Sequence, residues 1–192
     1  KGSGRSIEGY NMFEEITRCG YLLNKFGGHP MAAGISLDKE NIDEFRWQLN
    51  HNQKLTKEQL TPVTWIDVPM PLGYAGFPLI EQLKLLEPFG KGNARPVFAE
   101  RQVQVESARI LGKKKNVLKL QVKDLHGTRM DAMYFGDVNT FVEYVREKFG
   151  DIACECLLRG HGHGIVMAFT YYPDINEYRG VRTPQIVIQN YK

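Results

Sequence analysis

The chain has 192 residues, of which 42% are hydrophobic and 24% charged, and its formal net charge is +3. No apolar run reaches the roughly 20 residues of a membrane span, and no secretory signal pattern is present. The odd number of cysteines argues against a disulfide framework and for a reducing, cytoplasmic environment. The mild positive charge is compatible with a polyanionic partner. Because the first residue is Lys1 rather than methionine, we expect a part of a longer protein.

The first predicted elements are a short extended segment and an amphipathic helix. Residues 2–7 contain Arg5, whose forked guanidinium is suited to phosphate oxygens. Asn11, followed by Glu14, is typical of a helix N-cap. Apolar residues at steps of three or four then predict one helical face that continues as far as Phe26.

A glycine-rich motif follows this helix and allows two interpretations. Gly27 and Gly28 let a backbone approach a ligand closely, since no Cβ stands in the way. His29 can donate a hydrogen bond to an anionic oxygen, so the motif has the parts of a loop that faces a phosphate or a nucleotide. In the alternative, the glycines only end the helix, and a buried strand of small residues begins over residues 32–37.

A second helix is predicted after this strand. Asp38 is expected to cap it, and its apolar face contains Ile42, Phe45 and Leu49. Strand, helix, strand and helix in this order suggest an α/β or α+β unit. About 55 residues are marginal for an independent core, so we expect residues 1–58 to be half of a domain.

Residues 59–94 are predicted to form a connector, because they are rich in proline and glycine. One extended run is expected over residues 63–68. Apolar residues spaced over 79–86 predict a short amphipathic helix, which Pro88 ends.

From residue 95 onward the hydrophobic pattern changes to the alternation of β-strands. A helix capped by Asp137 and ended by Gly150 interrupts them. Three strands, one helix and further strands are the order of an OB-fold, a small β-barrel, which we assign to residues 95–192. The fold class is therefore α+β, with an inserted hairpin over 159–172 that exceeds the minimal five strands. Strands are predicted over 97–99, 103–110, 117–123, 129–135, 151–158, 165–172 and 184–190.

Lysines and aromatic residues of this barrel suit single-stranded nucleic acid. OB barrels stack bases on aromatic rings while cations follow the backbone. In each adjacent aromatic pair, Tyr134–Phe135 and Tyr171–Tyr172, one ring must face inward. The alternative is that the rings belong to the core and the lysines to a solvated hairpin tip. The candidate DNA contacts are Lys113, Lys114, Lys115, Lys119, Lys123, Phe135 and Tyr178.

Groups for catalysis are sparse. A two-metal nuclease needs clustered carboxylates and histidines, and the sequence has no Asp-His-His run, P-loop or Gly-x-Ser-x-Gly motif. Cys154, Cys156, His161 and His163 have the ligand types of a zinc site, but the two cysteines stand closer in sequence than usual. The alternative is a buried cysteine face on a strand, followed by a glycine-rich turn.

Two segments resemble the RecJ family of single-strand-specific exonucleases, which belong to the DHH phosphoesterase superfamily. Residues 27–34, Gly-Gly-His-Pro-Met-Ala-Ala-Gly, resemble the GGHxxAAG signature of the domain that accompanies DHH domains. Residues 86–93, Leu-Glu-Pro-Phe-Gly-Lys-Gly-Asn, resemble the LEPFGxGN junction of the family. Residues 2–7 resemble the strand before the first signature. Residues 175–180 and 185–188 resemble the closing OB strands, so the resemblance covers nearly the whole chain.

The resemblance implies a 5′-to-3′ exonuclease that degrades single-stranded DNA in recombination and repair. Manganese or magnesium would be held by a DHH domain whose metal motifs have no counterpart here, so we expect this chain to be the substrate-binding C-terminal part, inactive by itself and without a cofactor. Single-strand-binding protein and a recombination helicase are further implied partners, with no membrane. The competing hypothesis is an autonomous module that binds single strands or proteins without a nuclease role. The substrate contacts implied by the resemblance are Arg5, Gly27, Gly28, His29, Ala33 and Gly34.

Overall fold

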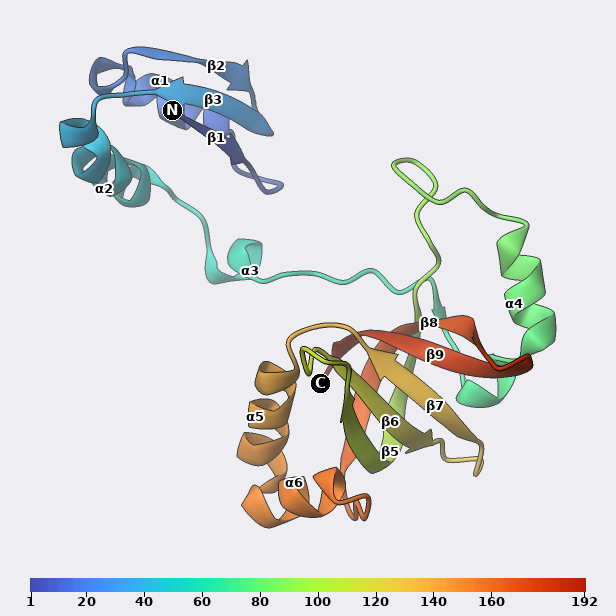
Figure 1. The fold of residues 1–192 in the computed structure, drawn as a ribbon. Coiled ribbons are helices and arrows are strands. Elements are labelled where there is room, and N and C mark those ends of the chain that lie inside the picture. Colours follow the sequence, from blue (N-terminus) through green and yellow to red (C-terminus); the bar gives the residue numbers. More distant parts are fainter. The chain divides into compact units, whose positions relative to one another are not determined.

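A computed structural model describes all 192 residues, which divide into two units, Lys1–Thr64 and Trp65–Lys192 (Figure 1). Each unit has its own cluster of buried hydrophobic side chains. The predicted α+β class is confirmed, and the second unit contains a closed five-stranded barrel. No helix has the length and apolar character needed to cross a membrane.

The first unit is a three-stranded antiparallel sheet with helices on one face. Strand β3 lies between β1 and β2. Ala33 of the central strand is buried together with Ile16 and Phe45, which come from the two longer helices. The elements are β1 (Gly2–Arg5), α1 (Met12–Arg18), β2 (Lys25–His29), β3 (Ala32–Ser36), α2 (Ile42–Asn52) and α3 (Lys57–Leu60).

The two predicted helix caps differ in the structure. Asn11 caps α1 as predicted, because its Oδ1 accepts the N–H of Glu14 and its Nδ2 donates to the Glu14 carboxylate at 2.7 Å. Asp38 makes no side-chain cap. Its Oδ1 accepts from the Nδ2 of Asn24 at 3.1 Å, and a single 3₁₀ turn, Lys39–Asn41, precedes α2.

The first predicted helix is too long. It ends at Arg18, and Gly27 and Gly28 lie inside strand β2 rather than ending a helix. The apolar spacing was misleading because Phe26, a strand residue, packs against the same core as Ile16 of α1.

The second unit is built around five strands that close on themselves. In sheet order they run β5-β6-β7-β9-β8, and β8 pairs back with β5. Strands β7 and β9 are parallel, whereas the other barrel pairs are antiparallel. Two helices stand between β7 and β8 in the chain, which is the OB order. The elements are β5 (Phe98–Leu111), β6 (Val117–Lys123), β7 (Arg129–Tyr134), α5 (Val138–Phe149), α6 (Asp151–Leu158), β8 (Val166–Tyr178) and β9 (Val181–Tyr191).

The strand predicted over residues 151–158 is wrong, because these residues form helix α6. Cys154 and Leu157 are buried three residues apart, on one helical face, while Cys156 is half-buried. With that strand removed, β8 is the fourth of five barrel strands, so the predicted inserted hairpin is also wrong.

The segment before the barrel strands belongs partly to the barrel core. Met70, Leu72 and Ala75 are buried among the core residues of the second unit. The hydroxyl of Tyr171 donates to the carbonyl of Met70 at 2.6 Å, and the N–H of Leu72 donates to Glu100 at 2.9 Å. The elements here are β4 (Val68–Pro69), a 3₁₀ helix (Leu72–Tyr74) and α4 (Phe77–Lys84), so the helix predicted over 79–86 is present with shifted ends.

We expect Tyr171→Phe to lower the free energy of unfolding of the barrel by about 1–2 kcal/mol, because it leaves the buried carbonyl of Met70 without its donor. Tyr178→Phe removes a hydroxyl from an exposed ring and is the matched control. Urea unfolding followed by circular dichroism measures both variants. Equal stability of the two would contradict this role of the bond.

Candidate nucleic-acid interface

One face of the first unit's sheet has no side chains at its centre. Gly27 of β2 pairs with Gly34 of β3, and a Cβ placed on either glycine would meet no atom within 4 Å. Peptide groups are therefore open to a ligand there. A hollow on this face is lined by these two glycines together with Lys1 and Lys25. We call Gly27, Gly34 and their peptide groups the glycine strip.

Basic side chains border the glycine strip. Arg5 and His29 both pair with Ala32, so the three residues form one row across the sheet, on the same face as Gly27 and Gly34. The N–H of Met31 donates to Nδ1 of His29 at 3.3 Å, which leaves Nε2 of this exposed histidine to donate outward. Arg5 and His29, at the two ends of the row, can both bind an anionic group. The backbone of the ligand that carries this group can then lie on the glycine strip.

Gly28 and Ala33, the other two predicted contacts in the motif, belong by register to the face that the helices cover, although Gly28 itself is exposed near the end of its strand. They pair with each other, and Ala33 is buried against the helices. A Cβ on Gly28 would collide with the carbonyl oxygen of Ala32 and lie 2.6 Å from the Cα of Ala33. Their part in the structure is thus close packing, and of the six predicted substrate contacts only Arg5, Gly27, His29 and Gly34 share the open face.

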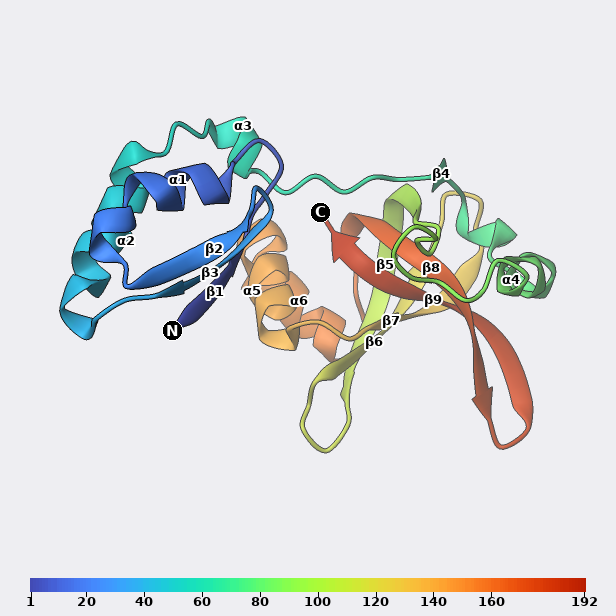
Figure 2. The same ribbon diagram turned by 90° about the horizontal axis from the view of Figure 1, so that it is seen from above.

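Two hairpins flank the outer face of β6 and β7 in the second unit (Figure 2). Leu118, Leu120 and Val122 of β6 are fully buried, so the alternating residues Lys119 and Lys123 point outward. We call the outward side chains of β6 and β7, with Phe135, Tyr178 and the loops 112–116 and 179–180, the hairpin face. OB-folds bind oligonucleotides on the corresponding strands and loops.

Two cations of the hairpin face, Lys119 and Arg129, are already paired, whereas Lys123 makes no ion pair. The ammonium of Lys119 lies 2.7 Å from Asp131 on β7. Arg129 donates two hydrogen bonds to Glu106, at 2.8 and 3.0 Å, and holds the pKa of that carboxyl below its usual range. These charges offset one another, so Lys119 attracts a DNA phosphate less strongly than an unpaired lysine would.

Most of the unpaired cations near this face lie in the loops, beside Lys123 on β6. Lys113, Lys114 and Lys115 are exposed in loop 112–116 and make no ion pair. Arg109, which faces Lys119 in the register of β5 and β6, is also exposed and unpaired. Arg179 lies in the opposite loop. Sequence reasoning missed both arginines, although Arg109 could have been found from the alternation of β5.

Each adjacent aromatic pair divides between core and surface, as predicted. Tyr171 is fully buried, and Tyr134 packs at 5.5 Å from the ring of Tyr191, whose burial raises its pKa to about 12. Phe135 and Tyr178 are 60% and 64% exposed, so both rings are accessible for stacking. The guanidinium of Arg179 lies 5.3 Å from the ring centroid of Tyr178.

The zinc alternative has no support in the geometry. Cys154 and Cys156 lie on helix α6, and burial raises the pKa of the Cys154 thiol. The chain contains no group of three or more histidine, cysteine, aspartate or glutamate side chains placed to hold a metal ion. A two-metal nuclease site also needs such a cluster, and the chain contains none.

Comparison with protein families matches both units. The RecJ OB domain matches residues 66–190, and the DHHA1 domain matches residues 1–54.

The single-stranded-DNA-specific exonuclease RecJ of Bacillus subtilis is 30% identical over 192 residues, covering 99% of this chain and 22% of the relative. The corresponding enzyme of Haemophilus influenzae is 29% identical, covering 98% of this chain and 31% of the relative. The chain thus spans between 22% and 31% of the length of these relatives.

Solved structures of RecJ from Thermus thermophilus have the same fold. The Mg²⁺ complex aligns with 100% of this chain and 26% of that chain, at 20% identity and a TM-score of 0.66. The Mn²⁺ complex aligns equally well, at 21% identity over 25% of that chain.

The two adjacent glycines of the motif should respond differently to alanine. We expect Gly28→Ala to destabilise the first unit by about 1–3 kcal/mol, because the new methyl group overpacks the sheet. Gly27→Ala should fold normally, since its methyl group enters open space. Thermal unfolding followed by circular dichroism compares the two. If Gly28→Ala melts at the temperature of Gly27→Ala, the packing role is refuted.

Proposed function

Because this chain belongs to the RecJ family, we propose that it is the part of a single-stranded-DNA exonuclease that holds the substrate strand. The family predicted from residues 27–34 and 86–93 is confirmed. The names of the curated relatives describe single-stranded-DNA-specific exonucleases, and we extend that substrate to this chain.

The observation that carries the proposal is the distribution of charge on the hairpin face. Three exposed lysines without ion-pair partners stand on one loop, and accessible rings lie at Phe135 and Tyr178. A single strand needs cations along its backbone and rings for its bases, and each stacked base contributes roughly 1–3 kcal/mol. The hairpin face supplies both.

The glycine strip supports a separate contact with single-stranded DNA in the first unit. Bare peptide groups bordered by Arg5, His29 and Lys25 suit a phosphate or a terminal nucleotide, because the backbone can approach closely and the cations lie on either side. We therefore assign Arg5, Gly27, His29 and Gly34 to the substrate, whereas Gly28 and Ala33 act through packing.

We place the cutting step outside these residues. Hydrolysis by two metals needs clustered carboxylates and histidines, and this chain offers no such cluster. The manganese or magnesium of the enzyme would then be held by a catalytic part elsewhere in the protein. Recombination and repair in the cytoplasm are the processes we propose, with single-strand-binding protein and a recombination helicase as partners.

Replacing Lys113, Lys114 and Lys115 together by alanine should weaken binding to single-stranded DNA about tenfold at moderate salt, because up to three phosphate contacts are lost. The slope of log affinity against log salt should fall by about 2. Fluorescence anisotropy with a labelled oligonucleotide measures both quantities.

The matched control is the triple variant of Lys39, Lys54 and Lys57, which removes the same charge from exposed positions of the first unit. Equal losses in the two triple variants would refute the hairpin face as the interface. Equal affinity of the unmodified chain for single- and double-stranded DNA would favour the competing module that binds proteins and has no nuclease role.

The purified chain should not shorten a 5′-labelled single-stranded oligonucleotide in the presence of Mn²⁺, because its residues form no metal cluster. Denaturing gel electrophoresis over a time course measures this. Metal-dependent shortening that co-purifies with the chain would contradict our placement of the cutting step.

A further inference from the structure

The segment 86–93, which carried part of the resemblance, forms a loop of fixed shape that the hairpin face does not use. The side-chain amide of Asn93 donates to the carbonyls of Leu86 at 2.8 Å and Pro88 at 3.0 Å. Gly90 and Asn93 also exchange two backbone hydrogen bonds, at 2.8 and 3.1 Å. The loop therefore holds the side chain of Phe89 in a defined position.

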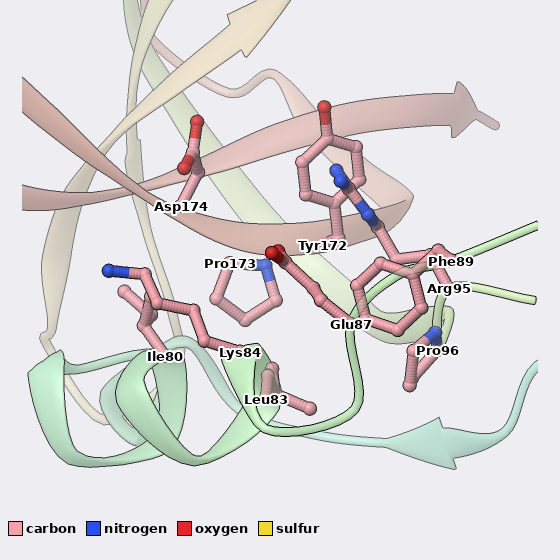
Figure 3. A pocket seen from close by; sticks show the side chains of 10 residues that line it. All are labelled: Ile80, Leu83, Lys84, Glu87, Phe89, Arg95, Pro96, Tyr172, Pro173 and Asp174. Atoms are coloured by element: carbon pink, nitrogen blue, oxygen red, sulfur yellow. The ribbon is translucent and has the colours of Figure 1, made fainter.

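Phe89 lines a pocket between this loop, helix α4 and strand β8 (Figure 3). The guanidinium carbon of Arg95 lies 4.3 Å from the ring centroid of Tyr172 and 5.2 Å from that of Phe89. Arg95 is exposed and has no carboxylate within ion-pair distance. An arginine held against aromatic rings and without an anionic partner is ready to bind one, because little side-chain freedom remains to be lost.

The pocket adjoins the hairpin face on the surface of the barrel. Tyr172 of β8 pairs with Val187 of β9, Val187 pairs with Met133 of β7, and Met133 pairs with Lys119 of β6. These four residues form one cross-strand row on the outer side of the barrel wall, in which Val187 is covered and only 5% exposed. Neighbouring strands lie about 4.8 Å apart, so the row extends roughly 14 Å from Lys119 to Tyr172. A strand that covers the site size of an OB-fold, about 4–16 nucleotides, can reach both ends.

We propose that this pocket is a further nucleotide subsite, in which Arg95 binds a backbone phosphate and the rings of Phe89 and Tyr172 receive the adjacent base. The inference rests on the proposed function and extends it beyond the hairpin face. Bases stack on aromatic rings and on arginine planes alike. The carboxylates of Glu87 and Asp174 line the same pocket and repel phosphate, which orients the phosphate toward Arg95 and the base toward the pocket.

Two substitutions separate the two parts of the subsite. Arg95→Ala should weaken binding of a labelled single-stranded oligonucleotide of about 16 nucleotides by about tenfold and lower its salt slope by about 0.7, the value for one phosphate contact. Phe89→Ala should weaken binding by a similar factor with an unchanged salt slope, because a ring is lost and no charge. Fluorescence anisotropy of the full chain at several salt concentrations measures both.

Matched controls are Arg159→Ala, which removes an exposed charge beyond helix α6, and Leu85→Ala, which truncates an exposed apolar side chain. Should Arg95→Ala fail to fold in a melting experiment, Arg95→Gln keeps a planar polar side chain without charge and should show the same loss of slope.

If Arg95→Ala has the same affinity and salt slope as Arg159→Ala, the phosphate contact is refuted. If Phe89→Ala has the same affinity as Leu85→Ala, the stacking is refuted. In both cases the unmodified chain still binds, so the proposed function would stand. If the unmodified chain does not bind single-stranded DNA, the proposed function fails and the subsite with it.

Discussion

The pairing of β5 with both β6 and β8 is the constraint on which the second unit depends. β5 covers 14 residues, and its register shifts between Glu100 and Val103, so that its first part pairs mainly with β8 and its second part with β6. This closure encloses the core and removes two sheet edges. It also fixes the two hairpins on either side of β6 and β7, because their strands are continuations of the barrel itself.

Closure also explains where charge is available. Strands packed side by side bring carboxylates and cations within ion-pair distance across the sheet, as at Lys119 with Asp131 and Arg129 with Glu106. Such pairs lie on the regular surface of the barrel and leave little net field. Loop residues have no cross-strand neighbour, so Lys113, Lys114 and Lys115 keep their charge. The outward surface of the barrel strands can therefore be nearly neutral while the hairpin loops still attract a polyanion.

Local pattern was sufficient where burial alternates with sequence. The strands 117–123 and 129–135 and the helix after Asp137 followed from period and capping, because one face of each is buried and the other is not. Helix α6 was missed because its residues are apolar on most sides, which hides the helical period. Met70, Leu72 and Ala75 were missed because proline and glycine around them indicate a connector. Residues distant in sequence, among them Tyr171, Glu100 and the start of β5, hold that segment in place.

The same limit applies to the glycine motif. Its residue types pointed to a ligand, yet only the register of three strands separates Gly27 and Gly34, on the open face, from Gly28 and Ala33, on the covered one. If the assumed start of a strand is wrong by one residue, each of these residues is assigned to the opposite face of the sheet.

The bare surface of that sheet has a further consequence. Peptide groups and bordering cations can hold a sugar-phosphate chain, but sequence is read at the edges of bases, and nothing on the strip is aimed at them. A ligand held there would be gripped with the same strength whatever its order of bases. Because Gly27 and Gly34 have no side chains, binding at the glycine strip is expected to be independent of base sequence.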